Sequence, residues 1–340
     1  MFSTNITPDD ATGIGRWNAA EFYRAMHNGR SRDGHLLYPA FPYANFTQIT
    51  RADSDALFAY LKSVPAVKQA NRANTLRFPY SMQASLAVWR AMFFSPGEFK
   101  PEADKSAEWN RGSYLVRGLG HCNACHGSRN IFGATSESLE LSGGLIPMQK
   151  WYAPALNARS EAGVAEWDTA HVVALLRDGV SPRASVMGPM AEVVFKSTQH
   201  LRPDDLQAMA VFLKTLPQAE EEPPPKKKKK EIVPGMTEGG KVYEKHCAQC
   251  HGKDGEGMPG AYPALAGNRA VILANPANLI RAVVSGGYLP STDGNPRPYG
   301  MPPFGQVLDD AQIASVLTYM RRSWGHEAPI VSAVDVLQYR

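Results

Sequence analysis

The sequence lacks long apolar runs, a large net charge and a recognisable leader, and each absence narrows what the protein can be. No stretch approaches the roughly 18 consecutive apolar residues that a membrane-spanning helix needs. The formal net charge is only +4, which gives no argument for a nucleic-acid partner. The start, Met1 to Asn5, has neither the basic residues nor the apolar core of a signal peptide. With 44% hydrophobic and 20% charged residues, the chain has a globular composition and a length that suits two or three domains.

Cysteine is also scarce, and its placement is the strongest signal in the sequence. The four Cys fall in two copies of one pattern, Cys122-Asn123-Ala124-Cys125-His126 and Cys247-Ala248-Gln249-Cys250-His251. C-x-x-C-H is the attachment sequence of a c-type haem. Two thiols three positions apart share one helical turn, so both can add to the vinyl groups of one porphyrin while the adjoining histidine reaches the iron. The sequence therefore predicts two covalently bound haems c, each with a histidine as its proximal ligand.

Three other interpretations of the cysteine pairs fit less well. A four-thiolate zinc site does not account for the histidine that follows each pair or for the long gap between the pairs. A thioredoxin-like redox pair requires a βαβ context that this sequence does not show. A disulfide between cysteines three positions apart would be strained.

A loop methionine is predicted to be the sixth iron ligand of the second haem. Met301 lies 50 residues after His251 and directly before a helix expected from Asp309 to Trp324. Methionine opposite histidine raises the potential of a haem and is common in electron-transfer cytochromes. Met258 is the competitor, but it lies too close to His251 in sequence to cross the haem. This order resembles that of small class I cytochromes c.

The middle motif has two candidate distal ligands. Met187 and Met190 lie about 64 residues after His126, and a helix is expected after them, from Pro203 to Leu216. Spacing alone does not choose between the two methionines.

Two further features of the last segment are typical of class I cytochromes c. Gly239 and Tyr243 share a helix face that can pack on the closing helix. Pro263 lies twelve residues after His251, where a proline carbonyl can accept a hydrogen bond from the second nitrogen of the histidine.

An internal repeat predicts a third, incomplete unit at the start of the chain. Gly13 and Trp17 recur as Gly163 and Trp167, an offset of 150, and both pairs precede an amphipathic helix, a glycine, a proline-containing loop and an acid-led helix. In the first copy this last helix is expected from Ala52 to Val64. Residues 1–100 therefore look like a cytochrome c unit that lacks its haem-binding helix. We expect the missing motif and any export signal to precede Met1, which would allow a third haem; a naturally haem-free cap is the alternative.

The chain resembles the three-haem cytochrome c subunits of membrane-bound bacterial dehydrogenases that oxidise alcohols, aldehydes, gluconate and related substrates. The resemblance covers nearly the whole chain and depends on these stretches: Ser3-Thr4-Asn5-Ile6-Thr7-Pro8-Asp9, Leu37-Tyr38-Pro39-Ala40, Ala56-Leu57-Phe58-Ala59-Tyr60-Leu61, Gly112-Ser113-Tyr114-Leu115-Val116, Gly188-Pro189-Met190-Ala191-Glu192-Val193-Val194 and Tyr262-Pro263-Ala264-Leu265-Ala266-Gly267-Asn268. Two departures are the absent first haem motif and Phe41 in place of a first-domain methionine.

The resemblance implies a function and a set of partners. Met190 would be the distal ligand of the middle haem, and Met301 that of the last. Electrons would come from a dehydrogenase catalytic subunit and pass to ubiquinone or another cytochrome, on the periplasmic side of the bacterial inner membrane. The membrane surface would be reached through the complex, catalysis would belong to the partner subunit, and nucleic acid is not an expected partner.

The predicted fold is all-α, with tandem class I cytochrome c domains in three units. The expected divisions are an incomplete unit at 1–100, haem domains at 105–218 and 235–327, a Pro/Lys-rich linker at 219–234 and a C-terminal tail at 328–340. A helix from Tyr80 to Phe93 is expected to pack between the first two units, or to present an apolar face to a partner subunit.

A di-haem enzyme of the peroxidase or thiosulfate dehydrogenase type is the alternative function, although such catalysis usually requires an open sixth position at the iron. A third hypothesis is an interaction scaffold in which the haems only stabilise the fold.

Overall fold

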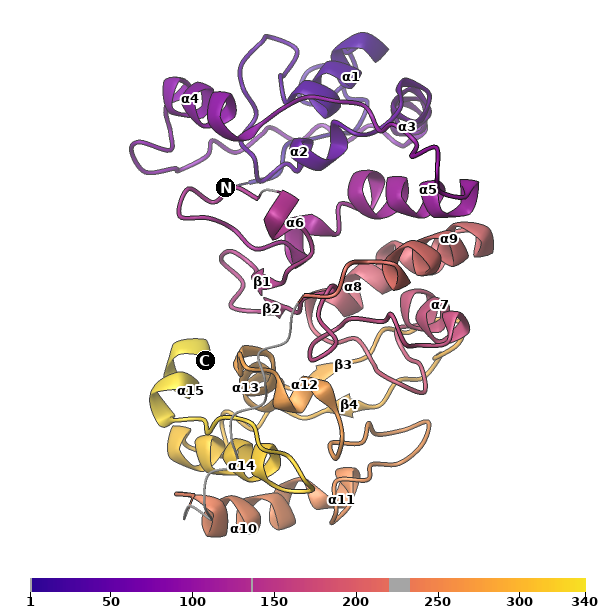
Figure 1. The fold of residues 1–340 in the computed structure, drawn as a ribbon. Helices are drawn as coiled ribbons and strands as arrows, with labels where there is room; N and C mark the ends of the chain where they lie inside the picture. Colours follow the sequence, from indigo (N-terminus) through magenta and orange to yellow (C-terminus); the bar gives the residue numbers. More distant parts are fainter. Residues whose placement is uncertain (1, 136, 220–232) are drawn as a thin grey trace. The chain divides into compact units, whose positions relative to one another are not determined.

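The computed structural model describes residues 2–135, 137–219 and 233–340, and it is mostly helical (Figure 1). The chain divides into two compact units, residues 1–140 and 141–340. Among the described residues no helix is both long enough and apolar enough to cross a membrane. The mostly helical class agrees with the prediction.

The first unit is built from short helices, some of which begin at a side-chain cap. Asn18 caps the first helix by accepting from the backbone N–H of Glu21, and the Glu21 carboxylate accepts in return from the N–H of Asn18. Thr50 caps the third helix in the same way through Asp53. The elements are α1 (Ala19–Asn28), α2 (Tyr43–Phe46), α3 (Arg51–Ser63), α4 (Gln83–Phe93), α5 (Ala107–Tyr114), the π-helix η1 (Leu115–Leu119), α6 (Asn123–His126) and the 3-10 helix η2 (Glu137–Leu139).

The second unit holds the remaining helices and two small antiparallel sheets. In one sheet Gly144 pairs with Ala153, and in the other Gly287 pairs with Met301. The strands are β1 (Gly144–Leu145), β2 (Tyr152–Ala153), β3 (Gly287–Tyr288) and β4 (Gly300–Met301). The helices are α7 (Thr169–Asp178), α8 (Pro189–Lys196), the 3-10 helix η3 (Thr198–His200), α9 (Pro203–Lys214), α10 (Met236–His246), α11 (Ala248–His251), α12 (Arg269–Ile272), α13 (Ala277–Ser285), α14 (Asp310–Arg322) and α15 (Ala333–Tyr339).

The repeat seen in the sequence is present as repeated structure. Helix α1 ends at Gly29 and α7 ends at Gly179, and both glycines adopt left-handed φ angles, 57° and 74°, which glycine adopts without strain. Each glycine is followed by a loop closed by an isolated β-bridge and then by the acid-led helix α3 or α9. The helix expected from Ala52 to Val64 is α3, and the helix expected from Pro203 to Leu216 is α9. The arrangement as three cytochrome c units stays a prediction.

The last segment has its own hydrophobic core, in which α10 crosses α14. Val242 and Tyr243 of α10 pack with Val316 and Leu317 of α14. At the crossing, a Cβ added to Gly239 would overlap the backbone carbonyl of Ser315, so only glycine allows the two helices this approach. The predicted packing of the Gly239 and Tyr243 face on the closing helix is confirmed.

The predicted linker and the predicted C-terminal tail flank this last segment. The linker expected at 219–234 lies almost wholly outside the described residues. The stretch expected as a C-terminal tail, 328–340, contains helix α15, and its Val331, Val336 and Tyr339 belong to the buried core. An apolar stripe on this short helix therefore makes it part of the fold.

Candidate haem sites

The second C-x-x-C-H motif forms one tight helical turn directly after α10. The backbone N–H of Cys250 donates to the carbonyl of Cys247 at 3.2 Å, and that of His251 donates to the same carbonyl at 2.9 Å. This turn places both thiols and the imidazole on one short element, as attachment to a single porphyrin requires.

The imidazole of His251 is oriented by the carbonyl predicted for that purpose. Its Nδ1 lies 3.0 Å from the backbone oxygen of Pro263. A carbonyl can only accept, so Nδ1 carries the proton and donates, which leaves Nε2 with a free lone pair. Burial lowers the pKa of His251, which favours the neutral imidazole that an iron ligand must be.

The loop that carries Met301 lies close to residues that flank the second motif. The ring of Phe304 lies 5.9 Å from that of His246, just before the motif, and Tyr299 lies 5.2 Å from Tyr262. Met301 itself is partly buried against the core and is held by pairing of β4 with β3. The competitor Met258 has 51% of its surface exposed. The structure thus brings the Met301 loop and the second motif together, as one haem site requires.

Three buried polar side chains of this segment make hydrogen bonds that the sequence did not reveal. Tyr243 donates its hydroxyl to the carbonyl of Gly252, next to His251, at 2.8 Å. Arg321 is 1% exposed and donates to the carbonyls of Val271 and Leu273 at 2.8 and 2.7 Å.

His326 is the third of these side chains. It accepts from the N–H of Gly267 at 2.9 Å through Nε2, and its Nδ1 lies 2.9 Å from the carbonyl of Met320. Arg321 could have been noticed in the sequence as a charged residue in the apolar stripe of α14. No sequence signal pointed to His326.

The first C-x-x-C-H motif lies in the first unit, where earlier segments of the chain hold it. It follows the π-helix η1, and the N–H of Cys122 donates to the carbonyl of Val116 at 3.1 Å. The carbonyl of Arg117 accepts from the side chain of Asn45 at 3.1 Å, and the guanidinium of Arg117 makes two bonds to Glu140, at 2.9 and 3.1 Å.

Tyr114 joins the helix before this motif to α3. Its hydroxyl donates to the carboxylate of Asp53 and accepts from the N–H of Thr50. Burial and the neighbouring Asp53 raise the pKa of Tyr114 to about 12. The phenol therefore stays protonated and able to donate at any physiological pH.

The predicted distal ligands of the middle haem, Met187 and Met190, lie in the second unit. Both side chains are partly buried, Met190 in the first turn of α8 and Met187 just before it. Because the two methionines and His126 belong to different units, the pairing of His126 with either one stays a prediction.

The loop that carries these methionines shares a corner with the loop that carries Met301. The carbonyl of Gly179 accepts from the N–H of Val186 at 2.9 Å, and the carbonyl of Asp178 accepts from the hydroxyl of Thr292 at 3.0 Å. A Cβ on Gly179 would overlap Pro290. We call Asp178 and Gly179 the shared corner, because both ligand loops of the second unit attach to it.

The raised pKa values of the thiols do not fit a redox-active cysteine pair. Burial raises the pKa of Cys122 to about 12 and that of Cys247 to about 11, whereas redox-active pairs have lowered thiol pKa values. All four cysteines are free. Within the described part of the chain, no cluster of three or more His, Cys, Asp or Glu could hold a metal ion, so a ready-made zinc site is absent there.

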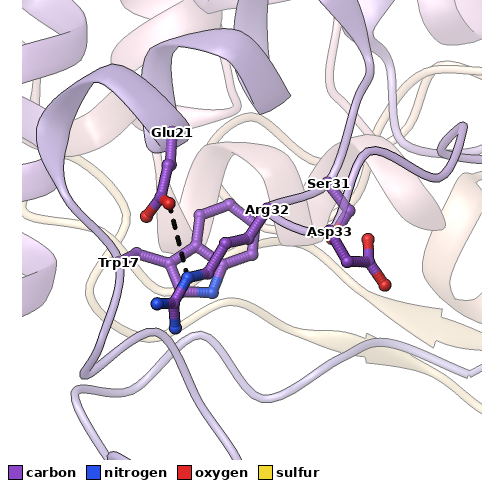
Figure 2. A pocket seen from close by; sticks show the side chains of 5 residues that line it. All are labelled: Trp17, Glu21, Ser31, Arg32 and Asp33. Atoms are coloured by element: carbon purple, nitrogen blue, oxygen red, sulfur yellow. Dashed lines mark ion pairs between the residues drawn. The ribbon is translucent and has the colours of Figure 1, made fainter.

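A hollow in the first unit contains none of the predicted site residues. It is lined by Trp17, Glu21, Ser31, Arg32 and Asp33. Figure 2 shows the Arg32 guanidinium beside the Trp17 ring, paired with Glu21 at 3.4 Å. In the same unit the loop around Phe41 supplies no methionine; the Phe41 ring packs 5.4 Å from Phe46.

The known proteins to which this chain is similar are cytochromes c. The cytochrome c family model matches residues 236–324, the stretch that contains the second motif and Met301. The chain is 38% identical to the cytochrome c subunit of the quinone-type alcohol dehydrogenase of Gluconacetobacter polyoxogenes, over all of this chain and 76% of that protein. It is 36% identical to the gluconate 2-dehydrogenase cytochrome c subunit of Pantoea cypripedii, over all of this chain and 81% of that protein. A diheme c-type cytochrome of Cereibacter sphaeroides is 33% identical over 64% of this chain and 71% of its own length.

Proposed function

Because this chain belongs to the family of cytochrome c subunits of dehydrogenase complexes, we propose that it carries two covalent haems c and passes electrons from a dehydrogenase catalytic subunit to ubiquinone or to another cytochrome. The relatives are electron-transfer subunits, which confirms the expectation that catalysis belongs elsewhere in the complex.

The observation that carries the proposal is the hydrogen bond from His251 Nδ1 to Pro263. It fixes the tautomer and the ring plane of the imidazole and leaves the lone pair on Nε2, as a proximal iron ligand requires, whereas the structural His326 uses both ring nitrogens within the fold. Covalently bound haem would supply a one-electron ferric/ferrous couple. Cys247 and Cys250 would hold it by thioether bonds, and His251 and Met301 would ligate the iron.

For the middle haem we propose Cys122 and Cys125 as attachment residues and His126 and Met190 as axial ligands. Met190 is favoured over Met187 by the resemblance in Gly188-Pro189-Met190-Ala191-Glu192. We further propose that the protein works at the periplasmic side of the bacterial inner membrane, associated with the membrane surface, because c-type haem attachment and the family both point there. A native protein found only in the cytosol would contradict this location.

The first experiment is the intact mass of the denatured protein purified from a host that attaches haem c. We expect two haems on this chain, both lost when the four cysteines are changed to alanine. A third haem on a longer native chain would agree with the repeat in the first segment. A chain with no covalent haem would rule the proposal out.

The second experiment assigns the distal ligands by potential. Met301→Ala should lower the midpoint potential of one haem, and Met190→Ala that of the other, because methionine raises haem potentials. Met187→Ala is the matched control and should leave both potentials in place. If Met187→Ala shifts a potential and Met190→Ala does not, the assignment of the middle ligand is wrong.

The alternative of a di-haem enzyme is not favoured by the similar proteins. It predicts turnover of peroxide or thiosulfate by the chain alone, which the same purified protein can test.

A further inference from the structure

Helix α4 presents an apolar stripe to the outside of the first unit. Its inner side packs Leu86, which is 8% exposed, and Trp89 lies beside Phe93 with ring centres 5.8 Å apart. The outer side is also apolar: Val88 is 59% exposed and Met92 is 56% exposed. The other exposed residues of α4 are three alanines, at positions 84, 87 and 91, and Gln83 in its first turn. A helix that is apolar on both sides is normally covered on both sides.

The turn that leads into α4 extends the stripe with aromatic side chains. Phe78 is 79% exposed and Tyr80 is 60% exposed. The N–H of Tyr80 donates to the carbonyl of Arg77 at 2.9 Å, so this turn is folded while its rings lie in solvent. We call Phe78, Tyr80, Val88 and Met92, with the three alanines, the α4 face. Figure 1 shows α4 at one end of the first unit, with α3 at the other.

The charge around the α4 face has one sign. From Ala56 to Gly97 the sequence contains no Asp or Glu, and its charged residues are Lys62, Lys68, Arg72, Arg77 and Arg90. Arg72 and Arg77 are exposed. Two other exposed apolar residues have acidic side chains on the same helix: Val193 follows Glu192, and Tyr60 lies on α3 with Asp53 and Asp55. The α4 face therefore combines exposed apolar side chains with a run of positive charge.

We propose that the α4 face lies on the anionic surface of a lipid bilayer, with its apolar side chains among the upper acyl chains and its arginines at the headgroups. Aromatic and cationic side chains at the rim of an apolar helix face are the pattern of an in-plane membrane helix. The run from Ala56 to Gly97, with five basic residues and no carboxylate, favours an anionic lipid surface as the occupant. The inference refines the membrane association proposed above by assigning it to one surface of this chain.

The test is flotation of the purified full chain, with its haems, on phosphatidylcholine vesicles with and without phosphatidylglycerol. We expect binding to the anionic vesicles that weakens with salt. The double variant Val88→Gln/Met92→Gln should bind about tenfold or more weakly, because two exposed apolar side chains no longer insert. Arg77→Glu should weaken binding to the anionic vesicles severalfold and leave the weak binding to phosphatidylcholine unchanged.

Tyr60→Gln is the matched control, since Tyr60 is 66% exposed but lies on α3 away from the α4 face; it should bind like the unmodified chain. Circular dichroism and haem content verify that each variant is folded. Absence of binding to anionic vesicles, or unchanged binding of the double variant, would overturn the proposal. So would a double variant that still binds vesicles but no longer binds the catalytic subunit, which would assign the face to a protein. Because flotation measures no electron transfer, its outcome is independent of the proposed redox function.

Discussion

The two C-x-x-C-H segments have the same motif but different supports. The last one is braced from within its own segment: Tyr243 bonds Gly252 and His251 bonds Pro263. The first is braced by residues that precede it by more than 60 positions, since Tyr114 bonds Asp53 and Asn45 bonds the carbonyl of Arg117. A tyrosine in the preceding helix thus bonds to its own motif in one case and to an earlier segment in the other.

This difference indicates that the segment at 1–100 has a structural task besides any redox task. It supplies hydrogen-bond partners to the helix that leads into the first motif, whether or not it carries a haem of its own. The second motif should depend far less on the segment at 1–100.

The largest expected effect is confined to the last segment. Gly239→Val would force α10 away from the Ser315 carbonyl, and we expect a loss of about 2–3 kcal/mol in stability. Urea unfolding followed at each haem should show the last site released first, with the middle one unchanged. The neighbouring change Gly240→Ala is the control: its Cβ would meet only the movable ring of Tyr319, at 3.3 Å, and should alter stability by no more than about 0.5 kcal/mol. Equal destabilisation of both sites by Gly239→Val would contradict the inference that the two motifs have separate supports.

A smaller effect is expected at the tyrosines. Tyr114→Phe leaves Asp53 and the N–H of Thr50 without a partner and should cost about 1–2 kcal/mol. Hydrogen exchange should locate the loss in α3 and α5. Tyr243→Phe should cost about 1 kcal/mol and loosen α10 and the second motif alone. If Tyr114→Phe loosens only the first motif and leaves α3 as protected as before, the preceding segment is not its support.

The smallest effect is expected at the shared corner. Thr292→Val removes the hydroxyl that donates to the buried carbonyl of Asp178 and should cost about 1 kcal/mol. Thr292→Ser keeps the hydroxyl and should cost less. Thermal unfolding measures the difference; equal losses for valine and serine would mean that the methyl group and not the hydrogen bond holds the corner.

The sequence predicted the features whose signals are local. Cys, Cys and His at fixed spacing located two short helical turns, and the twelve-residue spacing from His251 to Pro263 identified the carbonyl that orients the imidazole. Helical periodicity with acidic starts located α3, α9 and α14 to within one or two residues.

The supports of these features were not predictable, because they join residues distant in sequence. Tyr114 and Asp53 are 61 positions apart, and Thr292 and Asp178 are 114 apart. No periodicity links such pairs, and a tyrosine or threonine in a helix or loop has many ways to satisfy one hydroxyl. The C-terminal stretch at 328–340 was also expected only as a tail, since its few apolar residues give too short a pattern to predict that α15 completes a core.

The shared corner limits how freely the last segment could be exchanged among related proteins. The tip of its β3–β4 loop, at Pro290 and Thr292, is shaped to the backbone of Asp178 and Gly179. A chimera that brought in a foreign last segment would have to bring a loop of matching length and a small residue at position 179. Recombination at the linker between these segments is therefore expected to succeed only when the corner and the loop tip are inherited as a pair.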